Sequence, residues 1–205
     1  MIITFDGTSG SGKGSIASRV AKALGLKYLD TGKLYRAFAY IVQKENHIDH
    51  FATKSDEIAA KITSSILQLP ELYSEDIAKV ASLIARSGEV RQSLIDMQRD
   101  FAKGKQGAVL DGRDTGSVIC PQADYKFYID ADVKIRAQRR YDQLREKNII
   151  DKSLEDIMLD IKARDFSDKN RDLAPLIIPD GAFEIDNSKN SIEITVKKVL
   201  ELIDN

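Results

Sequence analysis

Short apolar runs alternate along this chain with longer segments in which hydrophobic positions repeat at the helical period. This alternation is typical of parallel sheets whose faces are covered by helices. We therefore predict the α/β class, with a parallel five-stranded sheet flanked by helices. The predicted strands are Ile2–Phe5, Lys27–Leu29, Ala108–Leu110, Lys126–Ile129 and Ala182–Ile185.

The clearest predicted helix follows the first strand. Ile16, Val20 and Leu24 stand at i, i+4 and i+8, which gives an apolar stripe suited to packing on a sheet, and Gly25 ends the helix. Pro70 and Gly88 mark breaks in the later helical segments. These segments are 31–46, 54–68, 74–102, 132–147, 153–171 and 190–204.

Two regions interrupt the regular alternation. Residues 41–86 are rich in helical pattern and hold no convincing strand, so we interpret them as an insert between the second and third strands. A polar stretch, Tyr141–Ser153, joins two charged helices and is expected to form a flap.

Composition and charge narrow the class of protein. With 205 residues, 31% of them charged, the chain suits one globular domain with additions. The formal charge of −1 gives no bulk electrostatic reason to bind nucleic acid or a membrane surface. The start of the chain lacks the pattern of a signal peptide, and a single cysteine, Cys120, fits a reducing compartment. We therefore expect a cytoplasmic protein.

A glycine-rich loop follows the first strand directly. Gly7, Gly12 and Lys13 match the general phosphate-loop pattern, in which backbone N–H groups and a helix N-terminus face phosphate oxygens. The alternative is a glycine-rich turn with no ligand. Gly14 stands where a magnesium-binding hydroxyl usually follows the lysine, and Ser15 comes one place late, which separates the loop from those of GTPases.

Arginines and aspartates gather in later segments. Arg164, Asp168 and Arg171 share one helix face at i, i+4 and i+7. Arg136, Arg139 and Arg140 form a second cluster. Each run alone also fits a solvated helix face, but phosphoryl transfer needs arginines to balance charge, and these runs accompany a phosphate loop.

Acidic groups follow the third strand. Asp111 and Asp114 come at the carboxyl end of that strand, where open α/β sheets bind ligands, and either could hold magnesium. Capping of the strand end by a turn is the structural alternative. Thr31 and Arg36 follow the second strand at the same edge and could meet an acceptor phosphate.

Two features are assigned no chemistry. His47 and His50 lack the further ligands that a zinc site needs, so we expect a surface loop. Cys120 has no catalytic histidine in view and is interpreted as structural.

Taken together, the motifs resemble those of bacterial cytidylate kinases, a family of nucleoside monophosphate kinases. The resemblance covers nearly the whole chain and rests on FDGTSGSGKGS, DTGKLYRAFA, LDGRDTGSV and RDFSDKNRDLAPL. It implies a phosphate-loop NTPase core (1–40, 87–139 and 166–205), a nucleoside monophosphate-binding insert (41–86) and a lid (140–165). It also implies transfer of the γ-phosphate of ATP to CMP or dCMP with Mg²⁺.

The resemblance assigns roles to individual residues. Catalytic roles are implied for Lys13, Arg113, Asp114 and Arg164, and a metal role for Asp111. The ATP phosphates are assigned to Gly7, Thr8, Ser9, Gly10, Ser11, Gly12, Lys13, Gly14 and Ser15. The acceptor nucleotide is assigned to Thr31, Tyr35, Arg36, Ser82, Arg91, Arg113, Arg164, Asp168 and Arg171. The lid arginines are Arg136, Arg139 and Arg140.

The sequence also departs from the family pattern. The stretch between Arg36 and Ser82 is shorter than in longer members, and no arginine lies within 69–76. Thr8 replaces a usual proline, and Ser117 a usual threonine. The missing arginine-bearing segment bears on how the base or sugar is discriminated, whereas the changes at Thr8 and Ser117 are mild.

Three alternative functions remain open from the sequence. The same chemistry on UMP, AMP or a small alcohol is the nearest. A GTP-binding switch is a second, although the chain lacks an Asn-Lys-x-Asp motif. An RNA-associated protein using 136–147 is a third, and interleaved acids argue against it. We expect a monomer that binds nucleotides and neither nucleic acid nor membrane.

Overall fold

The computed structural model describes residues 1–146 and 152–204. Within these residues, five strands form one parallel sheet in the order β2-β3-β1-β4-β5. The predicted α/β class is confirmed, and every predicted strand overlaps an observed one. The strands are β1 (Ile2–Gly7), β2 (Lys27–Asp30), β3 (Ala108–Gly112), β4 (Tyr125–Asp130) and β5 (Phe183–Asp186).

The neighbouring strands β1 and β3 each continue past their last apolar residue into an Asp-Gly step. Asp6 pairs with Gly112 in the β1–β3 ladder, so both strands extend beyond their predicted ends at Phe5 and Leu110, and the Asp111-Gly112 step, for which a turn was the structural alternative, belongs to the sheet. Ile3, Phe5 and Val109 in these strands are fully buried because helices cover both faces. The carboxyl ends of the strands therefore bring several aspartates to one edge of a rigid sheet.

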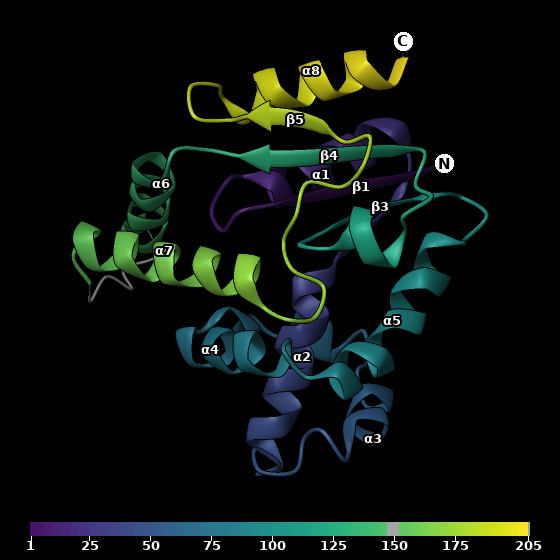
Figure 1. Cartoon of the computed structure of the whole chain (residues 1–205), viewed down its shortest axis with the longest axis vertical. Helices are drawn as coiled ribbons and strands as arrows, with labels where there is room; N and C mark the ends of the chain where they lie inside the picture. Colours follow the sequence, from purple (N-terminus) through teal and green to yellow (C-terminus); the bar gives the residue numbers. More distant parts are fainter. Residues whose placement is uncertain (147–151, 205) are drawn as a thin grey trace.

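One face of the sheet is covered by α1 (Lys13–Leu24) and α8 (Ile192–Asp204), whose Val20 and Val199 join the main apolar cluster. Ala102, near the end of α5 (Gly88–Ala102), packs on the other face. Figure 1 shows α2, α3, α4 and α5 below the sheet, while α6 and α7 lie beyond the arrowheads of β4 and β5.

A separate apolar cluster lies in the helical region below the sheet. It joins Phe38 of α2 (Thr31–Lys44), Ile58 of α3 (Ser55–Ala60), Ile84 of α4 (Glu75–Ile84) and Leu94 of α5. Residues 41–86 thus share their apolar cluster with the two helices that flank them in sequence. The role of this segment as a nucleotide-binding insert stays a prediction.

The single helix predicted over 54–68 is wrong. Helix α3 ends at Ala60, and two short 3₁₀ turns follow, η1 (Ile66–Gln68) and η2 (Pro70–Tyr73). The hydroxyl of Thr63 accepts a hydrogen bond from the N–H of Ile66, and such a local side-chain bond competes with helix continuation. The break near Gly88 is confirmed, with Ser87 capping α5.

Two helices stand beyond the carboxyl edge of the sheet: α6 (Val133–Glu146) and α7 (Leu154–Asn170), which pack through Ala137, Leu144, Ile157 and Ile161. A capping box of Ser153 and Asp156 begins α7. The predicted flap (141–153) and lid (140–165) include residues 147–151, which lie outside the described residues, as does the last residue of the predicted core, 205. In the described part of the chain, no helix is long and apolar enough to cross a membrane.

Candidate active site

The glycine loop bends sharply between β1 and α1. Gly10 and Gly12 take left-handed backbone conformations with φ of 77° and 89°. A Cβ at Gly7 would lie 1.9 Å from the carbonyl oxygen of Ile129 in β4, so only glycine fits there. No side chain among the described residues caps the N-terminus of α1, which leaves its first N–H groups facing the loop.

Lys13 opens α1 and lies beside the carboxyl end of β3. Its Nζ is 3.8 Å from Oδ2 of Asp111, whose Oδ1 accepts a hydrogen bond of 2.7 Å from the hydroxyl of Tyr28. Burial, and then the nearby Arg113, lower the pKa of Lys13 to about 8. Burial raises the pKa of Asp111 to about 6. The positive charge of Lys13 and the negative charge of Asp111 are thus only partly balanced by neighbouring groups of the protein.

Gly14 also lies against this carboxylate. A Cβ on Gly14 would stand 3.4 Å from Oδ2 of Asp111 and 3.5 Å from the Tyr28 hydroxyl. The absence of a side chain therefore leaves room between the loop and the end of β3.

A cavity of about 280 Å³ opens between the loop, α2, α4, α5 and α7. All nine residues that the sequence assigned to an acceptor nucleotide line it: Thr31, Tyr35, Arg36, Ser82, Arg91, Arg113, Arg164, Asp168 and Arg171. They come from segments far apart in the sequence. Lys13, Asp111 and Asp114 line the same cavity, so the predicted catalytic and metal residues lie with them.

The cavity carries an excess of positive charge. Six cationic side chains and four carboxylates line it, which leaves two positive charges uncompensated. Burial, and then Arg113, lower the pKa of Arg164 to about 10. The Nε of Arg164 is buried and has no hydrogen-bond partner among the described residues. A buried donor of this kind costs free energy, so the site fits an anionic ligand.

Ion pairs hold several other charged groups of the cavity in place. Arg113 Nε donates to Asp168 Oδ2 at 2.7 Å, and Arg91 pairs with Asp114. Arg171 Nη2 is 3.5 Å from the second oxygen of Asp114. Burial alone would raise the pKa of Asp168, but Arg113 and Arg164 hold it below its ordinary value.

A short π-helical turn that we did not predict supports these pairs. It is η3 (Thr115–Ile119), and it follows Asp114 directly. Both oxygens of the buried Asp6 carboxylate accept hydrogen bonds from the backbone N–H groups of Thr115 and Gly116, at 2.8 and 2.7 Å. Asp6 thereby ties the segment that carries Arg113 and Asp114 to the central strand.

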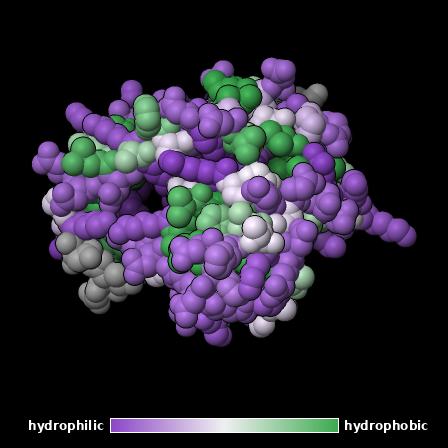
Figure 2. All heavy atoms as spheres, turned by 60° about the horizontal axis from the view of Figure 1, so that its bottom comes forward, coloured by the Kyte–Doolittle hydropathy of each residue, from purple (hydrophilic) through white to green (hydrophobic). Residues whose placement is uncertain are grey.

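A second cavity of about 440 Å³ adjoins the first and shares Arg36, Ser82 and Arg164 with it. It lies between α4, α6 and α7, and Arg140 and Lys152 line it. The space-filling view shows a hollow bordered largely by hydrophilic residues (Figure 2).

The three predicted lid arginines have different surroundings. Arg140 lines the second cavity, and its Nη1 donates to Gln143. Arg139 Nη2 donates to the carbonyl of Asn187 at 2.8 Å. Arg136 is 6% exposed and pairs with Asp165. Two of the three side chains are thus engaged with other parts of the protein.

The residues assigned no chemistry lie away from the cavity linings. Cys120 is buried in the apolar cluster next to β3, as the structural interpretation expected. His47 lies near Glu45 and Glu57, but Lys61 already pairs with both carboxylates.

Sequence reasoning missed several residues of the site. Asp30, at the end of β2, and Tyr73, in η2, line the first cavity. Arg36 Nη1 donates to the carbonyl of Leu72 at 2.8 Å, and its guanidinium lies 5.9 Å from the ring centroid of Tyr73. The ends of the strands were a usable signal for Asp30. No pattern marks Tyr73, since only the fold brings it beside α2.

Known proteins resemble this chain over its full length. A family model described as cytidylate kinase matches residues 3–205. The cytidylate kinase of Bradyrhizobium sp. (strain ORS 278) is 40% identical over 205 residues, which cover 100% of this chain and 96% of that protein. The cytidylate kinase of Neisseria meningitidis serogroup A is 45% identical over 212 residues, which cover 98% and 95%.

Among solved structures, the fold resembles that of shikimate kinase from Bacteroides thetaiotaomicron. The TM-score is 0.52 at 12% identity, and the match covers 100% of this chain and 99% of that one. An identity this low shows a shared fold alone. The matches in sequence carry more: because the family model and both relatives span almost the whole chain, this protein belongs to the cytidylate kinase family.

Proposed function

We propose that the protein transfers the γ-phosphate of ATP to CMP or dCMP, giving ADP with CDP or dCDP. Family membership supports this reaction. The structural observation that carries the proposal is the cavity beside Lys13, in which arginines from α2, α5 and α7 surround a space with excess positive charge. Such a site suits two phosphate-bearing substrates that must meet in line.

In this proposal the loop from Gly7 to Ser15 holds the ATP phosphates. The uncapped N-terminus of α1 offers N–H donors, and Lys13 lies between the loop and the cavity. Binding a phosphate would supply the negative charge that the lowered pKa of Lys13 indicates is missing.

The acceptor phosphate would bind Arg36, Arg113 and Arg164, with Thr31, Tyr35 and Arg171 positioning the nucleotide. The buried Nε of Arg164 supports this assignment, because an anion would satisfy it. No side chain needs to act as a strong base, since the acceptor is already an anionic phosphate. Arg113 and Arg164 would balance charge that develops during transfer.

Ser82, Arg91 and Asp168 would recognise cytosine. Asp168 pairs with Arg113 through Oδ2, and its Oδ1, which accepts no hydrogen bond from the described residues, would accept one from the amino group of the base. Arg91, which pairs with Asp114, would donate to ring and carbonyl acceptors of the base. An aspartate that accepts and an arginine that donates match the polar groups of cytosine.

Magnesium would bind at Asp111. A buried carboxylate with a raised pKa, oriented by Tyr28 and facing the space beside Gly14, is a suitable oxygen ligand for Mg²⁺ or its waters. When bound, the ion would neutralise part of the charge of the phosphate groups.

Other assignments from the sequence remain proposals. Residues 41–86 would act as the monophosphate-binding insert and 140–165 as a lid, in which Arg140 lines the second cavity. Closure of the lid would exclude water and so limit hydrolysis of ATP. A monomer located in the cytoplasm is part of the same proposal.

The test is a panel of acceptors with ATP and Mg²⁺, in which kcat/KM is measured for CMP, dCMP, UMP and AMP. We expect CMP and dCMP to be the best substrates. Turnover of AMP or UMP with none of CMP and dCMP would overturn the proposal.

A further inference from the structure

Asp165 on α7 is a buried carboxylate to which the sequence assigned no role. Its Oδ1 accepts a hydrogen bond of 3.0 Å from the backbone N–H of Ser9 in the phosphate loop. Its Oδ2 accepts one of 2.5 Å from Nη1 of Arg136 on α6. The side chain thus joins the loop to two helices that follow it much later in the chain.

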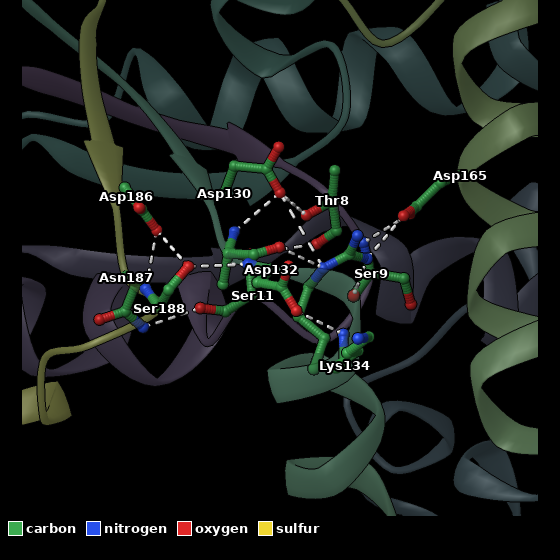
Figure 3. Close-up of polar contacts among 12 residues, drawn as sticks. Thr8, Ser9, Ser11, Asp130, Asp132, Lys134, Asp165, Asp186, Asn187 and Ser188 are labelled. Carbon is green, nitrogen blue, oxygen red and sulfur yellow. Dashed lines mark hydrogen bonds and ion pairs between the residues drawn. The ribbon is translucent and has the colours of Figure 1, made fainter. Parts of the chain in front are cut away.

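Arg136 completes this arrangement from the other side. The same Nη1 donates to the carbonyl of Ser9 at 2.9 Å, and Nε donates to the carbonyl of Ala131 at 2.7 Å. Both backbone polar groups of Ser9 are therefore held by one buried ion pair. Figure 3 shows Ser9 and Asp165 joined in this way, with Thr8 donating to Asp130 beside them.

The position of Asp165 in α7 links this contact to the cavity. Arg164 is the residue before Asp165. Asp168, three residues after Asp165, pairs with Arg113, which directly follows β3 in the chain. Helix α7 is thereby held at Asp165 by the loop and at Asp168 by the sheet edge. Rotation of the helix about its axis would break both contacts, so Arg164 is held facing the cavity.

The charge of Asp165 does not by itself favour the nucleotide. A carboxylate beside a loop that receives a triphosphate repels that ligand, and buried ion pairs add little net stability compared with apolar packing. Its contacts, however, fix the shape of the loop. Because small displacements of catalytic groups reduce reaction rates strongly, contacts that fix the loop geometry can affect the rate.

We propose that Asp165 is a positioning residue. Through Arg136 and the backbone of Ser9, it sets the shape of the phosphate loop and the register of Arg164 against it. This inference rests on the proposed phosphotransfer at the same site, and it adds a residue that does not contact the reacting atoms.

The test compares Asp165→Asn with Asp100→Asn, the same chemical change at an exposed position of α5. Calorimetric titration with ATP and Mg²⁺, without acceptor, gives Kd, and initial rates with CMP give kcat. We expect Asp165→Asn to weaken ATP binding and to lower kcat, each by about tenfold or more. The Asp100→Asn variant keeps both values, and circular dichroism reports whether each variant is folded.

The direction in which the ATP Kd of Asp165→Asn changes distinguishes a positioning role from a purely electrostatic or a purely structural role. Removal of a negative charge beside the loop would tighten ATP binding if only electrostatics mattered, and a purely structural pair would leave a folded variant unchanged. Either result overturns the proposal. If Asp165→Asn fails to fold, the double variant Arg136→Gln, Asp165→Asn is measured instead, because it removes both charges of the ion pair together. A double variant that keeps the wild-type ATP Kd and the wild-type kcat would equally refute the positioning role. A wild-type enzyme that binds ATP but does not use CMP would instead overturn the proposed acceptor.

Discussion

Asp168→Asn perturbs the ion pair that we propose holds the base-reading carboxylate. Asp168 Oδ2 lies 2.7 Å from Arg113 Nε, and both side chains are largely buried. Because the pKa of Asp168 is held below its ordinary value, the carboxyl is ionised at neutral pH and the substitution removes a full charge. A hydrogen bond to a charged group is worth about 1.5–3 kcal/mol. Loss of that amount from the transition state lowers kcat/KM by about 10- to 150-fold.

The assay measures kcat/KM for CMP at saturating ATP and, separately, the Kd of ATP by calorimetry. We expect the CMP value to fall by that range while the ATP Kd changes by less than about threefold, because Asp168 forms no hydrogen bond or ion pair with the loop in the described part of the chain. Urea unfolding separates this effect from loss of stability, and Asp96→Asn, an exposed change on α5, is the control. An unchanged kcat/KM for CMP, or equal losses for both nucleotides, would refute the base-reading role.

Two further predictions concern the metal and the loop. Tyr28→Phe removes the donor to Asp111 Oδ1, so the Mg²⁺ concentration for half-maximal rate should rise by about tenfold, with kcat at saturating Mg²⁺ unchanged. Identical Mg²⁺ titrations of variant and wild type would contradict this orienting role. Gly7→Ala places a Cβ against a backbone oxygen in β4 and should lower the free energy of unfolding by about 3 kcal/mol or more in urea. Gly25→Ala, which meets no described atom within 4 Å, should cost only about 1 kcal/mol, and equal losses would show that the close approach is unimportant.

The fold could be predicted because its signals are local. Strands β1, β3 and β4 are short apolar runs, and α1 and α2 carry a clear helical period, so much of the order of elements follows from the sequence. The failure at 54–68 is also local in cause. Thr63 satisfies a backbone N–H that a continued helix would have used, and hydrophobic spacing does not reveal such competition.

The sequence could predict many of the residues that line the cavity, but it could not predict which of their charged side chains form ion pairs with one another. Residues at the ends of parallel strands meet at one edge of the sheet, which is why Asp111 and Asp114 were expected near the loop. The partners of Arg136 and Asp168 depend on how α6 and α7 pack, and the helical spacing alone left both as candidates for solvated faces. Long-range pairs of this kind become visible only in the folded chain.

The most direct measurement of the central claim is a crystal structure with CMP bound. We expect the phosphate at Arg36, Arg113 and Arg164, with cytosine against Ser82, Arg91 and Asp168 and the glycine loop free for ATP. CMP bound outside this cavity, or with its base towards Lys13 and its phosphate towards Asp168, would contradict it.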